Sequence, residues 1–416
     1  MPGNRFLTAL RTGRFPRPGP PTIGRVLLSR RTLPALLALA VAAVGAGCGT
    51  GGVQAGSGGT PASARGASAS ARGPSASAVA GDVTATPART DVPEPARAPA
   101  LTRAPVGTVR PLPGAPEGLA VDAADGILAV GLRRPDGLAL VSVLTGRVGR
   151  VVRLPGAPRH LQLAGPRGPV LAPAEQAGRL FQVALPGGQV VADTKVGRQP
   201  HDAAAAGPVV FVGNEYSNTV SLVRGGKQIA VEPAPLQPGG VAAARDGSSV
   251  VVVGVRGRRI EAYTPGGRPL GTAPVGVGPT HVRAAPGGLF YVADTEGDAV
   301  ISFRVTATGP RRAGPHQVGS VRTRCCTPYG IAVDGRRGVL YVTLTASNLL
   351  ESFLIAGGRL VPGRTWPTVR QPNDVAVDEA TGRVFVAGPD DDQLQLIDPG
   401  SLPSSRSAGN RVDLPP

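Results

Sequence analysis

Seven copies of one phrase lie between Pro116 and Pro372. Each copy begins with a proline, continues through a short apolar run that often closes on Asp, and then has a Gly-punctuated run of β-branched or aromatic residues. The copies are 38 to 49 residues apart and begin at Pro116, Pro158, Pro200, Pro238, Pro279, Pro328 and Pro372. Repeats of about 40–50 residues with several strands each are typical of β-propeller blades. The spacing therefore predicts a seven-bladed β-propeller with four strands in each blade.

Three runs within each repeat have the character of successive strands from the axis outward. The first is short and small-sided, as in GLAVD at 118–122 and DVAVD at 374–378, which suits strands that crowd around one axis. The second is bulkier, as in LFYVAD at 289–294, and suits a strand buried on both faces. The third alternates polar and apolar residues, as in TVSLV at 219–223, which indicates one wetter face. The predicted class is all-β.

These phrases resemble the repeat of the YVTN-type and neighbouring NHL-like seven-bladed propellers. The third repeat carries the likeness in QPHDAAAA, VFVGN and NTVSLV, and the fifth repeat carries it in VGPTHV, FYVAD and DAVISF. The resemblance covers about residues 107–400 and implies the propeller architecture. It implies no single activity, because the family includes binding proteins, lyases and members without an assigned role.

Closure of the ring requires a strand from one end of the chain to complete the seventh blade, since this removes the free sheet edge. Two segments compete for this place. GTVRPLPGAP at 107–116 echoes GRVVRLPGAP at 149–158, whereas the tail offers NRVDLPP at 410–416. The echo favours the N-terminal segment.

Residues 1–47 are predicted to be a signal peptide. Seven arginines and no acidic residue precede Thr32, and an apolar stretch of 15 residues follows at 33–47. A basic segment, a short apolar segment and small residues before a cleavage point are typical of secretory signals. SRRTL at 29–33 resembles the twin-arginine signature, and GAGC at 45–48 resembles a bacterial lipobox, whose cysteine is lipidated after cleavage. Gly45 departs from the Leu that is usual in that motif.

Lipid on Cys48 would anchor the mature protein to the outer face of the cell membrane, and the alternative is an ordinary secreted protein. Residues 48–106 consist mainly of Ala, Ser, Gly, Pro and Thr without periodic apolar residues. Such a segment cannot bury enough surface to fold, so we predict a disordered tether. The propeller is expected to occupy residues 107–416.

The formal charge of +17 overstates the basic character of the mature chain, because seven of these charges are leader arginines and +10 remain from Cys48 onward. Aromatic residues make up only 3% of the chain, and none is interleaved with arginine doublets such as Arg133-Arg134. Stacking on nucleic acid is therefore not expected. The expected partners are the membrane, through Cys48, and a cell-wall polymer or a protein, and we expect a monomer.

Motifs for catalysis are absent from the sequence, which contains no G-x-S-x-G, H-E-x-x-H, C-x-x-C or Walker pattern. The residues after each repeat proline introduce an innermost strand, and we expect them at one mouth of the axial channel, where propellers commonly place ligands. The ligand-binding residues predicted on this basis are Glu117, His160, His201, Asp202, His281, Tyr329 and Asp374.

Three of the four histidines belong to this set, which raises the question of a metal site. His160 and His281 are each the second residue after a repeat proline, in nearly opposite blades, whereas His201 is the first. Alternation along a strand would turn His201 away from the face used by the other two. We therefore expect no metal and no other cofactor.

Cys325 and Cys326 are adjacent just before Pro328. Thiols of exported proteins tend to oxidise, and with Cys48 carrying lipid these two have only each other within the chain. Adjacent Cα atoms are 3.80 Å apart, below the usual 4.4–6.8 Å of a disulfide, so a bridge would be strained. We predict a vicinal disulfide in the wall of the channel mouth, and the alternative is two free thiols.

The sequence thus favours an extracytoplasmic, lipid-anchored propeller that acts as a binding or scaffold module for an unidentified ligand. The alternative is a propeller enzyme of the lyase, lactonase or quinoprotein kind that uses the histidines and acidic residues of the channel mouth.

Overall fold

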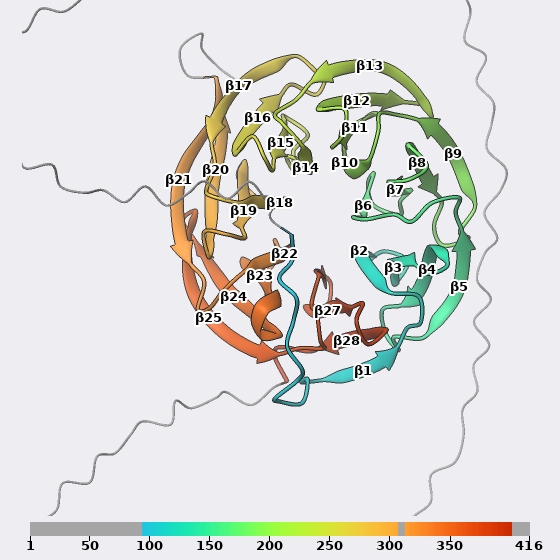
Figure 1. Ribbon diagram of the computed structural model, residues 1–416, viewed down its shortest axis with the longest axis vertical. Coiled ribbons are helices and arrows are strands. Elements are labelled where there is room, and N and C mark those ends of the chain that lie inside the picture. The colour runs from blue at the N-terminus through green and yellow to red at the C-terminus, as the bar shows by residue number, and fades with distance from the viewer. Residues whose placement is uncertain (1–93, 307–312, 402–416) are drawn as a thin grey trace, which may run out of the picture. The chain divides into compact units, whose positions relative to one another are not determined.

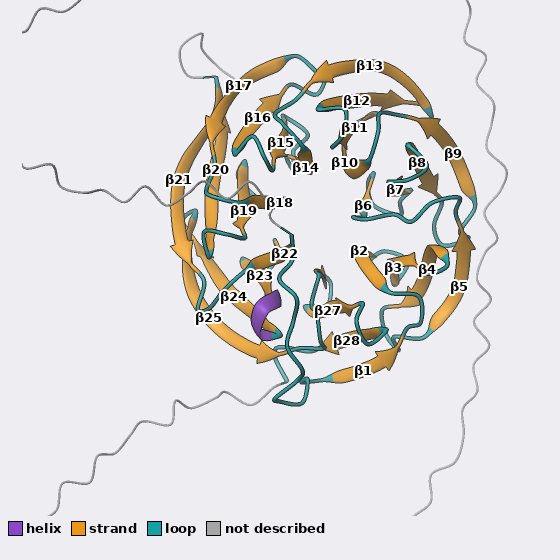
Figure 2. Ribbon diagram, viewed as in Figure 1, coloured by secondary structure: helices purple, strands orange, loops and turns teal. Residues whose placement is uncertain are grey.

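Seven four-stranded antiparallel sheets surround a central axis in the computed structural model, which describes residues 94–306 and 313–401 (Figure 1). These residues belong to one compact unit, Ala85–Pro416. The predicted all-β, seven-bladed propeller is confirmed. In the described part of the chain, the single helical element is a 3-10 turn, η1 (Thr345–Ser347), which is purple in Figure 2.

Each blade contributes one strand to the channel, and these innermost strands are β2 (Pro116–Asp122), β6 (Gln162–Leu163), β10 (Pro200–Ala206), β14 (Pro238–Ala243), β18 (Pro279–Ala285), β22 (Pro328–Asp334) and β26 (Asp374–Asp378). The second strands are β3 (Ile127–Arg133), β7 (Val170–Ala174), β11 (Val209–Asn214), β15 (Val250–Gly254), β19 (Leu289–Asp294), β23 (Val339–Leu344) and β27 (Arg383–Gly388).

The third strands are β4 (Asp136–Ser142), β8 (Arg179–Val183), β12 (Thr219–Arg224), β16 (Arg259–Tyr263), β20 (Ala299–Thr306), β24 (Leu349–Ala356) and β28 (Gln393–Ile397). The outermost strands are β5 (Val148–Arg153), β9 (Val190–Lys195), β13 (Lys227–Pro233), β17 (Pro269–Pro274), β21 (Gly314–Arg322), β25 (Arg359–Pro367) and β1 (Thr108–Pro111). We number the blades from one to seven in the order of their innermost strands.

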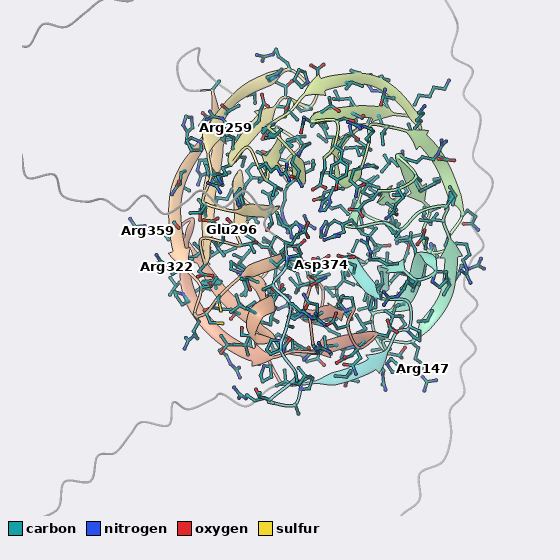
Figure 3. All side chains as sticks on the ribbon, in the orientation of Figure 1. Arg147, Arg259, Glu296, Arg322, Arg359 and Asp374 are labelled. Carbon is teal, nitrogen blue, oxygen red and sulfur yellow. The ribbon has the colours of Figure 1, made fainter. Side chains whose placement is uncertain are left out.

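The hydrophobic core lies between neighbouring blades. In one cluster, Phe290 and Phe303 of blade five pack with Val251 and Ile260 of blade four. All six residues of β11 are buried, whereas β13 at the edge of the same blade is mostly exposed. Figure 3 shows arginines such as Arg147 and Arg359 at the rim and Asp374 near the axis. The decrease in burial from axis to rim agrees with the three kinds of run in the sequence.

The N-terminal segment closes the ring, as the sequence echo favours. β1 pairs antiparallel with β28, and the register runs from Thr108 opposite Leu396 to Pro111 opposite Gln393. The competing tail at 410–416 lies outside the described residues. The pairing leaves blade seven with three strands from the C-terminal end and one from the N-terminal end.

Residues 94–106, which were assigned to the tether, also lie against the propeller. Ala98 is buried and its amide donates to the Gln371 side chain, while Asn348 donates to the Pro99 carbonyl. Figure 1 shows this segment running from near the axis to the rim, where β1 begins. The predicted signal peptide and the rest of the predicted tether lie outside the described residues. None of the helices in the described part is long and apolar enough to cross a membrane.

Closure of the ring requires a glycine at position 107, just before β1. Gly107 has a φ of 73°. A Cβ at this position would collide with the Leu396 carbonyl oxygen of β28. We expect Gly107→Ala to lower the free energy of unfolding by about 1–3 kcal/mol beyond the cost of a left-handed backbone alone. Chemical denaturation measures this change.

Gly126 provides the matched control, because it has a similar φ of 66° but no atom lies within 4 Å of the place that a Cβ would take. Gly126→Ala should show the left-handed backbone cost alone, about 1–2 kcal/mol. Equal destabilisation by both substitutions would contradict closure through β1.

Candidate functional site

The repeat prolines lie at one end of the axial channel. Each innermost strand runs antiparallel to its neighbour, so its first residue lies beside the last residue of the second strand, as Pro200 lies beside Asn214 and Pro279 beside Asp294. We call this end of the channel the proline end. The side chains that follow the prolines and those that follow the second strands therefore share one region.

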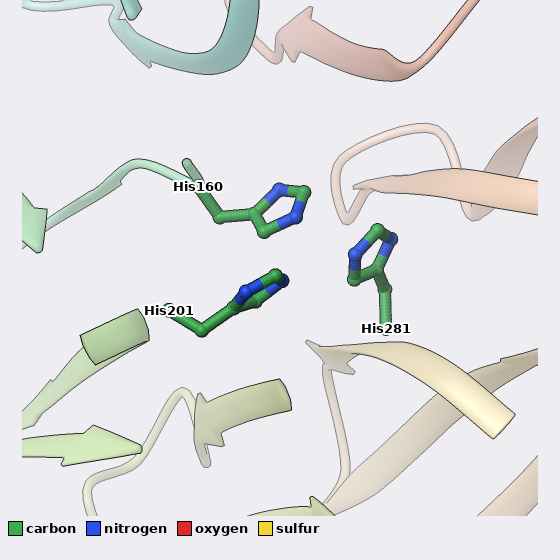
Figure 4. A group of neighbouring side chains, drawn as sticks. All are labelled: His160, His201 and His281. Atoms are coloured by element: carbon green, nitrogen blue, oxygen red, sulfur yellow. The ribbon is translucent and has the colours of Figure 1, made fainter. Parts of the chain in front are cut away.

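The imidazoles of His160, His201 and His281 converge inside the channel near this end (Figure 4). The ring centroid of His160 lies 4.8 Å from that of His201 and 4.1 Å from that of His281, and the other pair is 6.4 Å apart. All three side chains are buried. The expectation that His201 turns away from the other two is wrong, and with it the argument against a shared ion.

Backbone irregularity explains this difference. The pairing of β10 with β11 shifts register between Pro200 and Asp202, so the segment that holds His201 has one extra residue. The equivalent shift in blade five lies between Pro279 and Val282 and includes His281. His160 precedes β6 and follows the isolated bridge at Pro158. A bulge re-aims the side chains beside it, so alternation counted from the prolines fails at these positions.

Two carboxylates face His201. Its Nδ1 lies 3.2 Å from Glu175 and 3.3 Å from Glu215, and both acids are buried. Burial alone would lower the pKa of His201, but the charge of Glu215 and the interactions with both carboxylates raise it to about 10. Burial would likewise raise the pKa of Glu175, but its contact with His201 lowers it to about 2. The group is an imidazolium held between two carboxylates.

The other two histidines are held neutral. Burial lowers the pKa of His160 well below its usual value, and repulsion between its protonated form and the neighbouring imidazoles lowers it further. The pKa of His281 is lowered in the same way, first by burial and then by His201. His281 Nδ1 lies 3.0 Å from the Tyr329 carbonyl oxygen, so a hydrogen bond there requires Nδ1 to donate. Neutral imidazoles with free lone pairs are potential metal ligands.

Glu117 and Tyr329 belong to an ionic network at the same end of the channel. Glu117 pairs with Arg159 at 2.9 Å and with Arg133 at 2.8 Å, and Arg133 also pairs with Glu175 at 3.3 Å. Arg159 donates to the Tyr329 hydroxyl at 3.3 Å. These two predicted residues thus hold arginines in place.

Asp202 and Asp374 connect neighbouring blades. Asp202 accepts a hydrogen bond from the Val241 amide of the next blade at 3.2 Å. Asp374 accepts a hydrogen bond from the Leu119 amide of blade one at 2.8 Å. Both carboxylates are fully buried and tie neighbouring blades together. Asp202 also pairs with Arg283 at 3.2 Å. A ligand-binding role for these two residues stays a prediction.

A cavity of about 660 Å³ opens at the proline end over blades one to four. Of the seven predicted residues, His201 alone lines it. The charged side chains that sequence reasoning missed are Glu94, Arg133, Arg159, Glu175, Arg198, Glu215 and Arg256, and Glu94 pairs with Arg159 at 3.2 Å. Most of these lie where the second strands β3, β7, β11 and β15 end. Antiparallel pairing places that position beside the repeat prolines, and this is the signal that could have found them.

A second cavity lies at the opposite end of the channel. This cavity of about 760 Å³ is lined largely by small aliphatic residues of the innermost strands, with Arg245, Arg283, Arg336 and Glu379 among the charged residues. Arg245 pairs with Glu379 at 2.5 Å. None of the seven predicted residues lines this end.

Cys325 and Cys326 are free thiols rather than a vicinal disulfide. Cys325 is half-buried, with its Sγ 2.8 Å from the Ser347 hydroxyl, and Cys326 is exposed. The short separation of adjacent Cα atoms explains why the bridge is disfavoured. Neither thiol lines the cavity over blades one to four, and a place for their loop in the wall of the channel mouth stays a prediction.

No family model and no curated protein matches the sequence. Solved structures of several different proteins share the fold. Hydrazine synthase from Kuenenia stuttgartiensis is 14% identical with a TM-score of 0.55, over 69% of this chain and 96% of that one. The β-propeller domain of Cps50 (Swd1) from Myceliophteria thermophila is 11% identical with a TM-score of 0.59, over 70% and 99%.

Streptogramin B lyase is another of these structures. It is 13% identical with a TM-score of 0.57, over 71% of this chain and 96% of the lyase. Identities this low show the fold alone, because one propeller architecture supports many unrelated functions. The likeness to YVTN-type or NHL-like repeats stays a prediction.

The buried carboxyl of Asp374, which connects blade seven with blade one, makes the free energy of unfolding depend on pH. Burial raises the pKa of this carboxyl to about 7, although the charge of Arg283 and two backbone amides lower it. Between about pH 4 and pH 7 the folded chain retains a proton that the unfolded chain releases, so stability falls as the pH rises. We expect the stability of Asp374→Asn relative to wild type to rise across this window by at most about 1.4 kcal/mol per pH unit.

Asp246 is the control, since it is exposed and its hydrogen bonds with Ser248 lower its pKa. The relative stability of Asp246→Asn should therefore fall as the pH rises to about 4 and then stay constant between about pH 4 and pH 7. Urea denaturation at several pH values measures both differences. A flat difference for Asp374→Asn would show that this carboxyl is ionised throughout.

Proposed function

We propose that the protein is an exported, lipid-anchored propeller that binds a small acidic ligand in the cavity at its proline end. The observation that carries this proposal is the arginine lining of that cavity. Arg133 and Arg159 are held by ion pairs with buried glutamates. Arg198 and Arg256 are exposed, line the cavity and make no ion pair with any described residue. A carboxylate or phosphate is the natural partner of two such guanidinium groups.

The rest of the lining narrows the ligand class. The side chains of Gln176, Gln199, Asn218 and Gln237 supply amide donors and acceptors. Tyr216 and Leu236 lie beside them and are 59% and 50% exposed. Amides together with an exposed aromatic ring suit a hydroxyl-rich molecule with one apolar face. An acidic sugar, free or as part of a cell-wall polymer, fits this combination. A protein carboxylate is the competing ligand.

Export and anchoring form the other half of the proposal. It rests on the basic and apolar leader at 1–47 and on the lipobox-like GAGC that ends at Cys48. A propeller that is tethered outside the membrane would meet cell-wall polymers directly. Secretion without lipid is the alternative.

An enzyme is the second candidate function, because three buried imidazoles converge beside the cavity. Streptogramin B lyase, a propeller of similar fold, is an enzyme by its name. A lyase or lactonase reaction would use these histidines on a ligand held by the arginines. Turnover of a bound acidic sugar ester would distinguish this candidate from a binding module.

The arginine lining predicts selective loss of anion binding. We expect the double substitution Arg198→Ala, Arg256→Ala to weaken binding of glucuronate by about 10–100-fold, because a hydrogen bond to a charged group contributes about 1.5–3 kcal/mol. The melting temperature should change little, since both side chains are exposed. Isothermal titration calorimetry measures the affinity, with glucose as the neutral comparison ligand.

The rim arginines Arg147 and Arg322 supply the control (Figure 3). Their double alanine variant removes the same formal charge from outside the cavity and should bind glucuronate as the wild type does. An equal loss in both variants would indicate a general effect of charge and would overturn the proposed site.

Lipidation of Cys48 predicts where the chain is found in cells. Cys48→Ser should move the protein from the membrane fraction to the soluble fraction, because the acyl chains supply the membrane affinity. The propeller should keep its melting temperature, since Cys48 precedes it. Wild type and variant that fractionate identically would end the lipoprotein proposal.

A further inference from the structure

We propose that His160, His201 and His281 form a binding site for a divalent transition-metal ion of the zinc class. The inference goes beyond the proposed function, because it concerns a second ligand in the channel rather than the acidic ligand in the cavity. The three imidazoles come from blades two, three and five, and one ligand nitrogen from each lies within 4.8 Å of the others. Tetrahedral zinc with bonds of 2.0–2.1 Å places its nitrogens about 3.4 Å apart, so small side-chain rotations would complete the site.

Ion pairs at His201 and a hydrogen bond at His281 orient two of the ligands. His201 presents Nδ1 to Glu175 and Glu215, and His281 presents Nδ1 to the Tyr329 carbonyl oxygen. Metal-bound histidines almost always place their second nitrogen against a carboxylate or a carbonyl in this way. Nε2 of both rings is then the ligand atom. A bound ion would replace the proton on Nε2 of His201, and the carboxylates that favour the protonated ring would favour the metal-bound ring.

His160 supplies the strongest single observation. Its side chain is 1% exposed, and neither ring nitrogen has a hydrogen-bond partner among the described residues. Burial of an unpaired polar group costs about 1–3 kcal/mol. The ring of His160 lies beside the other two histidines, with centroid distances of 4.1 and 4.8 Å (Figure 4). An ion between the three imidazoles would give a ring nitrogen of His160 a partner.

The competing explanation is a purely structural cluster of rings. His281 also packs edge-on against Tyr329, with ring centroids 4.4 Å apart. Apolar side chains would fill the channel in the same way without unpaired nitrogens, so packing alone does not account for three histidines here. The charges of Glu175 and Glu215 offset the charge of a divalent ion. Three protein ligands would leave a fourth position open, as in catalytic zinc sites.

The test is direct metal binding by the full chain. After treatment with a chelator, the protein is titrated with Zn²⁺ and separately with Co²⁺. We expect one ion per chain and a visible Co²⁺ spectrum without a thiolate-to-metal charge-transfer band. His160→Ala, His201→Ala and His281→Ala should each lower the Zn²⁺ affinity by at least about 100-fold. Glu215→Gln, which changes a neighbour of a ligand, should lower it by about 10-fold.

Two controls separate this site from incidental binding. His316 lies on the outermost strand β21, and His316→Ala should bind Zn²⁺ as the wild type does. The double variant Cys325→Ser, Cys326→Ser should also keep its metal. Circular dichroism identifies any variant that fails to fold, and the wild-type Co²⁺ spectrum tests the ligand set independently of all variants.

A wild-type chain that takes up no Zn²⁺ would overturn the inference. Zn²⁺ binding that survives all three histidine substitutions, or that depends on the two thiols, would overturn it as well. These results are independent of the proposed function, because the metal titration contains no acidic ligand and the arginine variants leave the histidines intact.

Discussion

Ring closure through β1 is the interaction on which the rest of the structure depends. The pairing of Thr108–Pro111 with β28 completes blade seven and holds it against blade one. Only then does Asp374 of blade seven reach the Leu119 amide of blade one. A complete ring also buries the channel from the side, and burial is what shifts the pKa values of the histidines inside it. The chemistry near the axis is thus a consequence of a strand pairing at the rim.

The proline end of the channel is built from alternating charges. Glu117, Arg133, Glu175 and His201 follow one another through ion pairs of 2.8 to 3.3 Å. Desolvation of each charge is costly, and the alternation is what makes burial of the whole set tolerable. Such a network fixes the side chains before a ligand arrives, which reduces the ordering cost of binding. The exposed Arg198 and Arg256 line the cavity beside this network, and the Arg198 guanidinium donates to the Tyr216 carbonyl oxygen at 2.6 Å.

The sequence predicts the architecture well because the repeat period, the strand character and the N-terminal echo all report backbone-level features. It predicts the site less well for two physical reasons. Bulges beside Pro200 and Pro279 break the alternation on which the orientation of His201 was judged. Residues after the second strands, such as Glu175 and Glu215, carry no motif of their own and are found only by considering which strand ends lie side by side. The thiols at Cys325 and Cys326 remain unbridged because adjacent Cα atoms are too close.

Two glycines explain how the imidazole side chains fit within the narrow channel. A Cβ at Gly118 in blade one would approach the His160 Cα of blade two to 2.9 Å, and a Cβ at Gly240 in blade four would approach the His281 Cα of blade five to 3.3 Å. Each glycine thus lets the histidine backbone of the next blade approach the backbone of its own blade closely. Gly118 and Gly240 are therefore part of the site, because the convergence of His160 and His281 depends on the absence of a Cβ at these two positions.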